Sequence, residues 1–214
     1  MALKLFYSPG ACSIVPHIAL EEAGAQFEPV KVVLAEGQHL TPEYLAINPH
    51  ARVPALGTDR GVISENIAIL NYIADQYGAA GSVPRGDPDA AAHCNQLLGW
   101  CASTVHISFA QVWRANRFTR DESAHPAIIE GGRENLEQQF AEINQLSGEG
   151  WLAGDEFSGA DGYALIFFRW GKRIGMDMGR FAGWAALNER TLARAAVQRV
   201  LEREGWKVDD FRAE

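Results

Sequence analysis

The sequence predicts an α/β domain followed by an all-helical domain, and two observations carry this prediction. Strand and helix patterns alternate over residues 1–78, whereas helical periodicity alone accounts for residues 89–214. Between them, residues 79–88 (Ala-Ala-Gly-Ser-Val-Pro-Arg-Gly-Asp-Pro) are small and turn-rich, which is typical of a linker. We therefore expect two domains joined by a linker at these boundaries.

The first domain opens with a β-α-β pattern. Apolar side chains alternate along residues 3–7, which predicts a short strand with one buried face. A helix is expected over residues 13–23, closed by Gly24, and a second strand over residues 27–34. This order implies a parallel strand pair with a crossover helix.

A β-β-α pattern follows. Residues 53–56 and 62–63 predict two strands joined by a hairpin turn, Asp59-Arg-Gly61. A helix then begins at Ser64-Glu65-Asn66 and ends near Gly78. The combined order, β-α-β and then β-β-α, favours a thioredoxin-like domain.

Only helices are expected in the second half. A long helix runs from a cap at Asp87 or Asp89 to about residue 118, and another covers residues 125–146. A third begins at Ser158-Gly-Ala-Asp161, a capping-box pattern with Asp in place of Glu. Its body is apolar nearly all round, which predicts a buried central helix. Two more helices are expected within residues 181–204.

Composition narrows the classes of partner. The chain has 19 Lys and Arg against 27 Asp and Glu, a net charge of -8, which disfavours nucleic acid. No apolar run is long enough for a bilayer, and the N-terminus lacks a signal-peptide pattern. Three cysteines without disulfide or metal-site spacing fit a reducing compartment. We expect a soluble, cytoplasmic protein without a metal.

Cys12 lies where the first strand turns into a helix. A helix N-terminus favours a thiolate over a thiol, although a lone cysteine is more often a small buried filler. The run Cys12-Ser-Ile-Val15 has no second cysteine, so it cannot form an internal disulfide. A single thiol at this place can form a mixed disulfide with glutathione or donate a hydrogen bond to the glutathione sulfur.

Val53-Pro54 is the second candidate segment. It is either an ordinary start of an edge strand or a cis-proline turn beside the thiol. In the second case, the backbone of the residue before the proline can pair with a peptide-like ligand as an added strand. Glutathione is such a ligand.

Ser64-Glu65-Asn66 is the third candidate segment. A helix start needs a cap on structural grounds alone. The functional alternative is that the helix N-terminus and Asn66 receive the γ-glutamyl carboxylate of glutathione while Glu65 pairs with its ammonium group. All three segments fall on turns at the same end of one small sheet, which the purely structural alternatives do not explain.

The chain as a whole resembles bacterial glutathione transferases, especially the beta class. The resemblance rests on Tyr7-Ser-Pro-Gly-Ala-Cys-Ser13, Asn48-Pro49, Val53-Pro54-Ala-Leu56, Ser64-Glu65-Asn66, Ala68-Ile69, Tyr72-Ile73-Ala74, Phe157-Ser-Gly-Ala-Asp161 and Arg169-Trp170. These motifs are specific in combination and span nearly the whole chain. They imply the glutathione transferase fold.

The resemblance also implies roles for single residues. Catalytic roles fall to Cys12, Ser13 and His106, and second-substrate contacts to Phe109 and Trp113. Glutathione contacts fall to Ala11, Cys12, His39, Arg52, Val53, Pro54, Glu65 and Asn66. His106 shares a predicted helix face with Ser103, Ala110 and Trp113. The alternatives are that His106 is a packed or surface histidine and that the two aromatic residues belong to the core.

Some positions depart from the beta-class pattern. Asn66 replaces the usual Ser or Thr, and its amide can still donate to a carboxylate. Gly99 and Ile107 replace the frequent Asn and Lys. Gly37-Gln38-His39-Leu40 is more like the theta and delta classes, where this histidine binds the glycyl carboxylate of glutathione. The alternative is that His39 is a solvated loop residue.

By resemblance, the activity is attack of the glutathione thiolate on a small hydrophobic electrophile, or thiol–disulfide exchange through Cys12, in a homodimer. The other hypotheses are a non-catalytic binding module of the same fold and a dedicated dehalogenase, isomerase or lyase. Cys94 and Cys101 lie seven residues apart on the long helix and are expected to be inert packing residues.

Overall fold

The computed structural model describes residues 3–213. Its N-terminal part contains β1 (Leu3–Tyr7), α1 (Ile14–Glu22), β2 (Phe27–Lys31), α2 (Pro42–Leu45), β3 (Ala55–Thr58), β4 (Gly61–Ser64) and α3 (Asn66–Tyr77). Its C-terminal part contains α4 (Pro88–Trp100), α5 (His106–Trp113), α6 (His125–Leu146), α7 (Gly159–Arg173), α8 (Ala182–Leu192) and α9 (Ala195–Glu204). The predicted fold class, an α/β domain followed by an all-helical domain, is confirmed.

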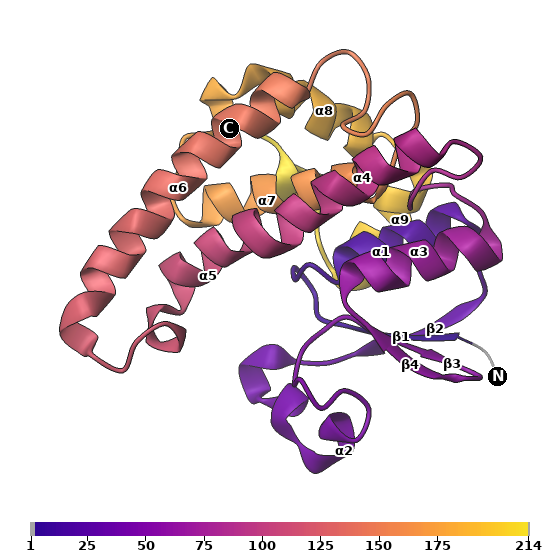
Figure 1. The fold of residues 1–214 in the computed structure, drawn as a ribbon, viewed down its shortest axis with the longest axis horizontal. Helices are drawn as coiled ribbons and strands as arrows, with labels where there is room; N and C mark the ends of the chain where they lie inside the picture. Colours follow the sequence, from indigo (N-terminus) through magenta and orange to yellow (C-terminus); the bar gives the residue numbers. More distant parts are fainter. Residues whose placement is uncertain (1–2, 214) are drawn as a thin grey trace.

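The sheet has the strand order β2-β1-β3-β4. β1 is parallel to β2, with Leu3 opposite Phe27, and antiparallel to β3, with Leu5 opposite Leu56. The predicted β-α-β and β-β-α units are therefore correct. Figure 1 shows α1 and α3 on one face of the sheet, between the sheet and the helical domain, and α2 beyond the other face.

The first long helix of the second half is interrupted, contrary to prediction. Cys101–Val105 form a π-helical turn between α4 and α5, and α5 ends at Trp113. Arg114 leaves the helical conformation (φ -144°, ψ 46°), and a 3-10 turn, Ala115–Arg117, follows. A π turn inserts a residue into the helical repeat, so the simple spacing argument that put Ser103 on the face of His106 does not hold.

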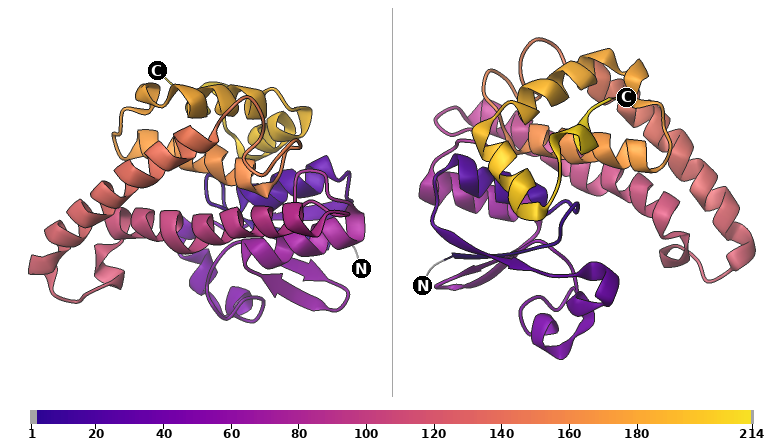
Figure 2. Two further views of the ribbon diagram at one scale, coloured as in Figure 1. Left: turned by 45° about the horizontal axis from the view of Figure 1, so that its top comes forward. Right: turned by 180° about the vertical axis from the view of Figure 1, so that it is seen from behind.

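α7 is the central helix, as predicted. Ser158 accepts from the backbone N–H of Ala160 (3.3 Å), and Asp161 accepts from that of Ser158 (2.9 Å), which forms the capping box. Asp161 also accepts from the N–H of Leu152 (2.9 Å). The helix is buried along nearly its whole length. Figure 2 shows it under α6 and α8, while α5 and α6 extend beyond the sheet.

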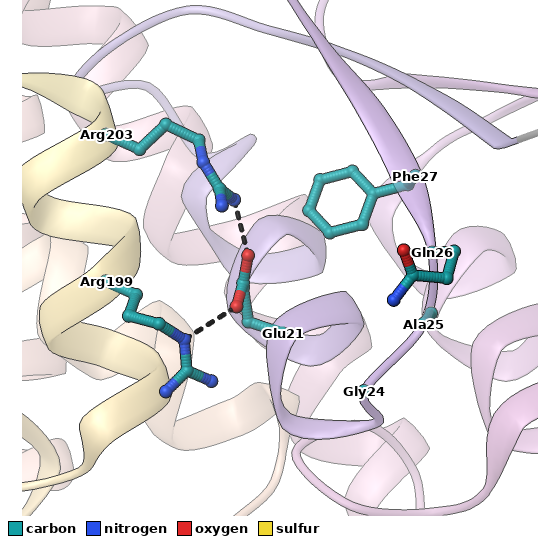
Figure 3. A pocket seen from close by; sticks show the side chains of 7 residues that line it. All are labelled: Glu21, Gly24, Ala25, Gln26, Phe27, Arg199 and Arg203. Carbon is teal, nitrogen blue, oxygen red and sulfur yellow. Dashed lines mark hydrogen bonds and ion pairs between the residues drawn. The ribbon is translucent and has the colours of Figure 1, made fainter.

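α9 joins the helical domain to α1. The Arg194 guanidinium binds the Glu22 carboxylate through two hydrogen bonds (2.6 and 2.9 Å), and Arg199 and Arg203 both bind Glu21 (Figure 3). These two arginines and Glu21 also line a surface hollow at the end of α1 opposite to Cys12.

The connection between α3 and α4 packs against the body of the protein. Val83 is fully buried, and the carbonyl oxygen of Ser82 accepts from the backbone N–H of Gly159 at the start of α7 (2.9 Å). A segment with the composition of a linker is thus anchored to the central helix. That residues 79–88 form a linker between two domains remains a prediction.

Candidate active site

The turn between β1 and α1 is fixed by Ser8 and Ser13. The Ser13 hydroxyl accepts from the backbone N–H of Ser8 (3.0 Å) and donates to its carbonyl oxygen (3.2 Å). The backbone N–H of Ala11 also donates to that carbonyl (3.0 Å). Because Ser13 is fully buried and its hydroxyl is used within the turn, we correct its expected catalytic role to one of positioning Cys12.

Cys12 lies at the start of α1 with 9% of its surface exposed. Its Sγ donates to the carbonyl oxygen of Val53 (3.9 Å). Burial raises the pKa of the thiol to about 12, against the smaller opposing effects of its own backbone N–H and of Asn66. Burial of the thiol therefore opposes the thiolate that the helix N-terminus favours, and the expected thiolate stays a prediction.

The loop before β3 carries Val53 and Pro54, which are joined by a cis peptide bond. The carbonyl oxygen of Arg52 accepts from the Tyr44 hydroxyl (2.7 Å) and from Nδ2 of Asn48 (2.8 Å). The loop is therefore anchored on its far side by α2 and Asn48. Its near side presents the backbone of Val53 to Cys12.

Glu65 lies between β4 and α3 in a conformation that is rare for residues other than glycine (φ 68°). Its exposed side chain does not cap α3, so the purely structural explanation of Ser64-Glu65-Asn66 is incomplete. The negative charge of Glu65 acts on Cys12, as does the positive charge of Arg52. Strained backbone of this kind is concentrated at functional sites.

Asn66 turns its side chain into the protein. Nδ2 donates to the carbonyl oxygen of Cys12 (3.1 Å) and to the Tyr163 hydroxyl (2.8 Å). The expectation that this amide donates to a ligand carboxylate is therefore corrected, because both of its hydrogens are already bonded. Asn66 can still offer a ligand its backbone N–H, because N–H groups in the first turn of a helix such as α3 lack intrahelical partners.

His106 begins α5 and packs its ring against Trp170 (5.2 Å between ring centroids) and Phe167 (6.5 Å). Burial lowers the pKa of the imidazole to about 4, and the charges of Arg114, Arg117 and Arg52 lower it further. The ring is thus neutral at about pH 7. No hydrogen bond connects His106 to Cys12 within residues 3–213, so its catalytic role stays a prediction.

Phe109 and Trp113, the two aromatic residues expected to contact the second substrate, differ in exposure. Phe109 is 0% exposed and lies among Trp113, Phe140, Phe167 and Trp170. It is a core residue, which corrects its assignment to substrate binding. Trp113 stacks on Phe109 (5.2 Å), lies edge-on to Trp170 (5.2 Å) and has the Arg173 guanidinium over its ring (5.5 Å), but the residue is 38% exposed, so its contact with the second substrate stays a prediction.

His39 lies in a 3-10 turn, Gln38–Leu40, beyond β2. Its ring is half-buried, and Nδ1 has no hydrogen-bond partner within residues 3–213. Oε1 of Gln38 accepts from the backbone N–H of Val33 (2.8 Å) and so fixes this turn. His39 is therefore not a fully solvated loop residue. No hydrogen bond connects it to Cys12 within residues 3–213.

Three hydrogen bonds at the candidate site were not predicted from the sequence. The Tyr163 hydroxyl bonds to Asn66, the indole N–H of Trp170 donates to the carbonyl oxygen of Gly10 (2.9 Å), and the backbone N–H of Gly10 donates to Glu204 (3.1 Å). All three connect the helical domain to the turns of the first domain. Their partners are distant along the chain, so no local pattern indicates them.

Within residues 3–213, no group of three or more His, Cys, Asp or Glu is arranged to hold a metal ion. None of the helices described has both the length and the apolar character of a membrane span.

Comparisons with known proteins define the class. The family model for the N-terminal domain of glutathione S-transferases matches residues 1–75, and the model for the C-terminal domain matches residues 115–204. A relative, glutathione S-transferase GST-4.5 of Xanthomonas campestris pv. campestris, is 32% identical over 95% of this chain and 99% of its own length. The chain belongs to the glutathione S-transferase family.

Solved structures agree with this assignment. A sphingomonad glutathione S-transferase complexed with glutathione has a TM-score of 0.81 and 34% identity, with 95% of this chain and all of that chain covered. The beta-class glutathione S-transferase of Sphingomonas chungbukensis has a TM-score of 0.80 and 32% identity, with 95% and 100% covered. The resemblance to bacterial and beta-class members is thereby confirmed.

Proposed function

We propose that this protein binds glutathione and transfers it to small hydrophobic electrophiles. The observation that carries the proposal is the position of the Cys12 thiol, which donates to the carbonyl oxygen of Val53 beside an uncapped α3 N-terminus and the exposed carboxylate of Glu65. Each of these groups matches one part of glutathione.

The peptide-like middle of glutathione pairs with the backbone of Val53 as an added strand. Its γ-glutamyl carboxylate lies at the N-terminus of α3, where free N–H groups and the helix dipole favour an anion. The ammonium group pairs with Glu65. Arg52 and His39 lie on the two loops available to the glycyl carboxylate.

Cys12 acts as a hydrogen-bond donor in this proposal. Because its pKa is raised to about 12, the thiol keeps its proton and can turn from the Val53 carbonyl to the sulfur of bound glutathione. Donation to the charged form lowers the pKa of the glutathione thiol and makes the nucleophile available. The same raised pKa disfavours thiol–disulfide exchange, which requires a Cys12 thiolate.

The electrophile lies between this sulfur and α5, against the exposed ring of Trp113. Conjugation forms a bond from sulfur to carbon, expels the leaving group with its electron pair, and releases the thiol proton to solvent. We also propose a cytoplasmic homodimer, on the basis of the family. Light scattering at micromolar concentration tests the dimer, and a monomer mass would contradict it.

Calorimetry with millimolar glutathione and conjugation kinetics with chlorodinitrobenzene test the main proposal. We expect binding and turnover in the wild type. Cys12→Ser retains a hydroxyl donor and should keep more of kcat than Cys12→Ala, at similar glutathione affinity. A wild type that binds no glutathione would refute the proposed function and leave the fold unaffected.

A further inference from the structure

His17 is a buried titratable residue that the proposed reaction does not use. It lies in α1, in the same turn and helix region as Cys12, and its side chain is fully buried. The imidazole ring packs against Tyr7 (4.9 Å between ring centroids) and Phe27 (5.6 Å). A polar ring in such surroundings needs partners for its nitrogens, and the structure provides one for each.

Both partners of His17 come from α9. Nδ1 lies 2.9 Å from Oε1 of Glu204, whose side chain is also fully buried. Nε2 lies 3.3 Å from Nη1 of Arg203. A guanidinium can only donate, so Nε2 accepts and carries no hydrogen. The hydrogen of the neutral ring is therefore on Nδ1, which donates it to the Glu204 carboxylate.

The second oxygen of Glu204 reaches the loop that carries the thiol. Oε2 accepts from the backbone N–H of Gly10 (3.1 Å). A Cβ on Gly10 would lie 2.9 Å from Cζ2 of Trp206, just after α9, and 3.0 Å from Nη1 of Arg169. Because packing this close leaves no free space, a shift of α9 at Glu204 is transmitted to Gly10 and to Cys12, two residues later.

The other side of the His17 ring is fixed at the protein surface. Arg203 also donates to Glu21, whose second carboxylate oxygen binds Arg199 (2.9 Å; Figure 3). A continuous series of hydrogen bonds thus connects the surface to the thiol loop, and its members are Arg199, Glu21, Arg203, His17, Glu204 and Gly10. His17 is the member that accepts on one side and donates on the other, so it joins the surface ion pairs to the buried carboxylate.

We propose that His17 is a positioning residue for the glutathione reaction, and that its Nδ1–H holds the Glu204 carboxylate on Gly10 and so keeps the Cys12 loop in place. The inference rests on the proposed function, because the reaction that it supports is the one proposed above. A small displacement of a reacting group has a large effect on rate. Loss of the Nδ1 donor should therefore lower kcat more than it changes the KM for glutathione.

The position of the ring hydrogen can be tested without any turnover. Long-range proton–nitrogen correlation spectra of the isotope-labelled wild type distinguish a protonated ring nitrogen from an unprotonated one. His17→Asn identifies the His17 signals among those of the six histidines. We expect a protonated Nδ1 and an unprotonated Nε2 at about pH 7. A ring protonated at Nε2 alone, or at both nitrogens, would overturn the inference.

Two variants separate the hydrogen-bond donor from the bulk of the ring. His17→Asn keeps an N–H donor close to the place of Nδ1, whereas His17→Leu fills the space without a donor. We expect His17→Leu to lower kcat about tenfold and to change the KM for glutathione by less than about twofold. His17→Asn should recover at least about half of the wild-type kcat. His93→Leu, on the exposed surface of α4, is the control.

Two kinetic results would contradict the positioning role. One is a wild-type kcat in His17→Leu, and the other is an equal loss in both His17 variants, because the packing of the ring and not its donor would then be responsible. Circular dichroism confirms that each variant is folded at the assay temperature. If His17→Leu is unfolded, Glu204→Gln takes its place, since one amide oxygen cannot serve both donors. A wild-type kcat in Glu204→Gln then overturns the inference.

Glutathione binding separates this inference from the proposed function. If the wild type binds and turns over glutathione while His17→Leu equals it, the inference fails alone. If the wild type neither binds glutathione nor reacts, the proposed function fails, and the alkylation rate of Cys12 by iodoacetamide replaces kcat as the readout. His17→Leu should then react at least about threefold faster than the wild type and His17→Asn, because a loosened loop exposes the buried thiol. Equal alkylation rates in the three proteins would show that His17 does not position the loop.

Discussion

The side-chain amide of Asn66 donates to the Tyr163 hydroxyl (2.8 Å), so the first residue of α3 is bonded to the central helix of the other domain. The same amide donates to the carbonyl oxygen of Cys12 (3.1 Å). One side chain thus connects the turn that carries the thiol, the helix start beside Glu65, and α7. Its Oδ1 is buried as well.

Asn66→Ala should destabilise the protein. It leaves two buried acceptors without their donor, which costs about 1–3 kcal/mol in the free energy of unfolding. Tyr163→Phe should cost less, because Asn66 then keeps its bond to Cys12. Urea denaturation measures both variants against Asn116→Ala, an exposed control. An Asn66→Ala protein as stable as the wild type would contradict the network.

Glu65→Gln should weaken glutathione binding by roughly tenfold or more, since a hydrogen bond to a charged group contributes about 1.5–3 kcal/mol. The fold should not change, because the Glu65 side chain is exposed and does not cap α3. Calorimetry measures the affinity, with Glu43→Gln on the exposed surface of α2 as the control. Equal affinities in the two variants would remove Glu65 from the site.

The alkylation rate of Cys12 should rise with pH without reaching a plateau below about pH 10, because burial raises the thiol pKa to about 12. Cys12 should still react before Cys94 and Cys101, which are more deeply buried. Iodoacetamide labelling with peptide mapping measures this, and oxidised glutathione should show the same order. A plateau near pH 7 would mean that the site stabilises a thiolate after all.

His106 should make stability depend on pH. Its pKa is about 4 in the folded protein against 6.5 in the unfolded chain, so the unfolded chain binds more protons between these values. The free energy of unfolding should therefore decrease as the pH falls from about 6.5 towards 4. His106→Asn should remove this part of the decrease. Denaturation curves at several pH values test it, and identical pH dependence in both proteins is the contrary result.

The variants Phe109→Ala and Trp113→Ala should show which of the two aromatic residues belongs to the core and which contacts the second substrate. Phe109→Ala should reduce the free energy of unfolding by about 3–5 kcal/mol, the usual cost of a large core cavity. Trp113→Ala should cost less, since the ring is partly exposed, and should instead raise KM for an aromatic electrophile. Thermal denaturation and steady-state kinetics give the two readouts. A larger loss of stability in Trp113→Ala would reverse the assignment.

The sequence could predict elements whose signals are local. Apolar alternation indicates β1, the Ser158 and Asp161 pair indicates the start of α7, and the order of strands and helices indicates the sheet. The positions of Cys12, Val53 and Glu65 on neighbouring turns follow from that order. Each of these signals depends on residues close together in the chain.

The rest could not be predicted because it depends on burial by distant residues. Burial raises the pKa of the Cys12 thiol, and no sequence motif indicates that burial. The inward turn of Asn66 depends on Tyr163, 97 residues later. The π turn before His106 leaves no signature in the spacing of apolar residues. The fold is therefore easier to predict than the chemistry of the thiol.

Gly10, two residues before the thiol, is held entirely from the other half of the chain. Trp170 binds its carbonyl oxygen and Glu204 its N–H, which satisfies both backbone groups of this residue. A fragment that ends after α3 would contain Cys12, Val53 and Glu65 and still lack the partners that fix the loop. The two halves, made as separate polypeptides, would have to associate before the thiol faces glutathione in its proper place.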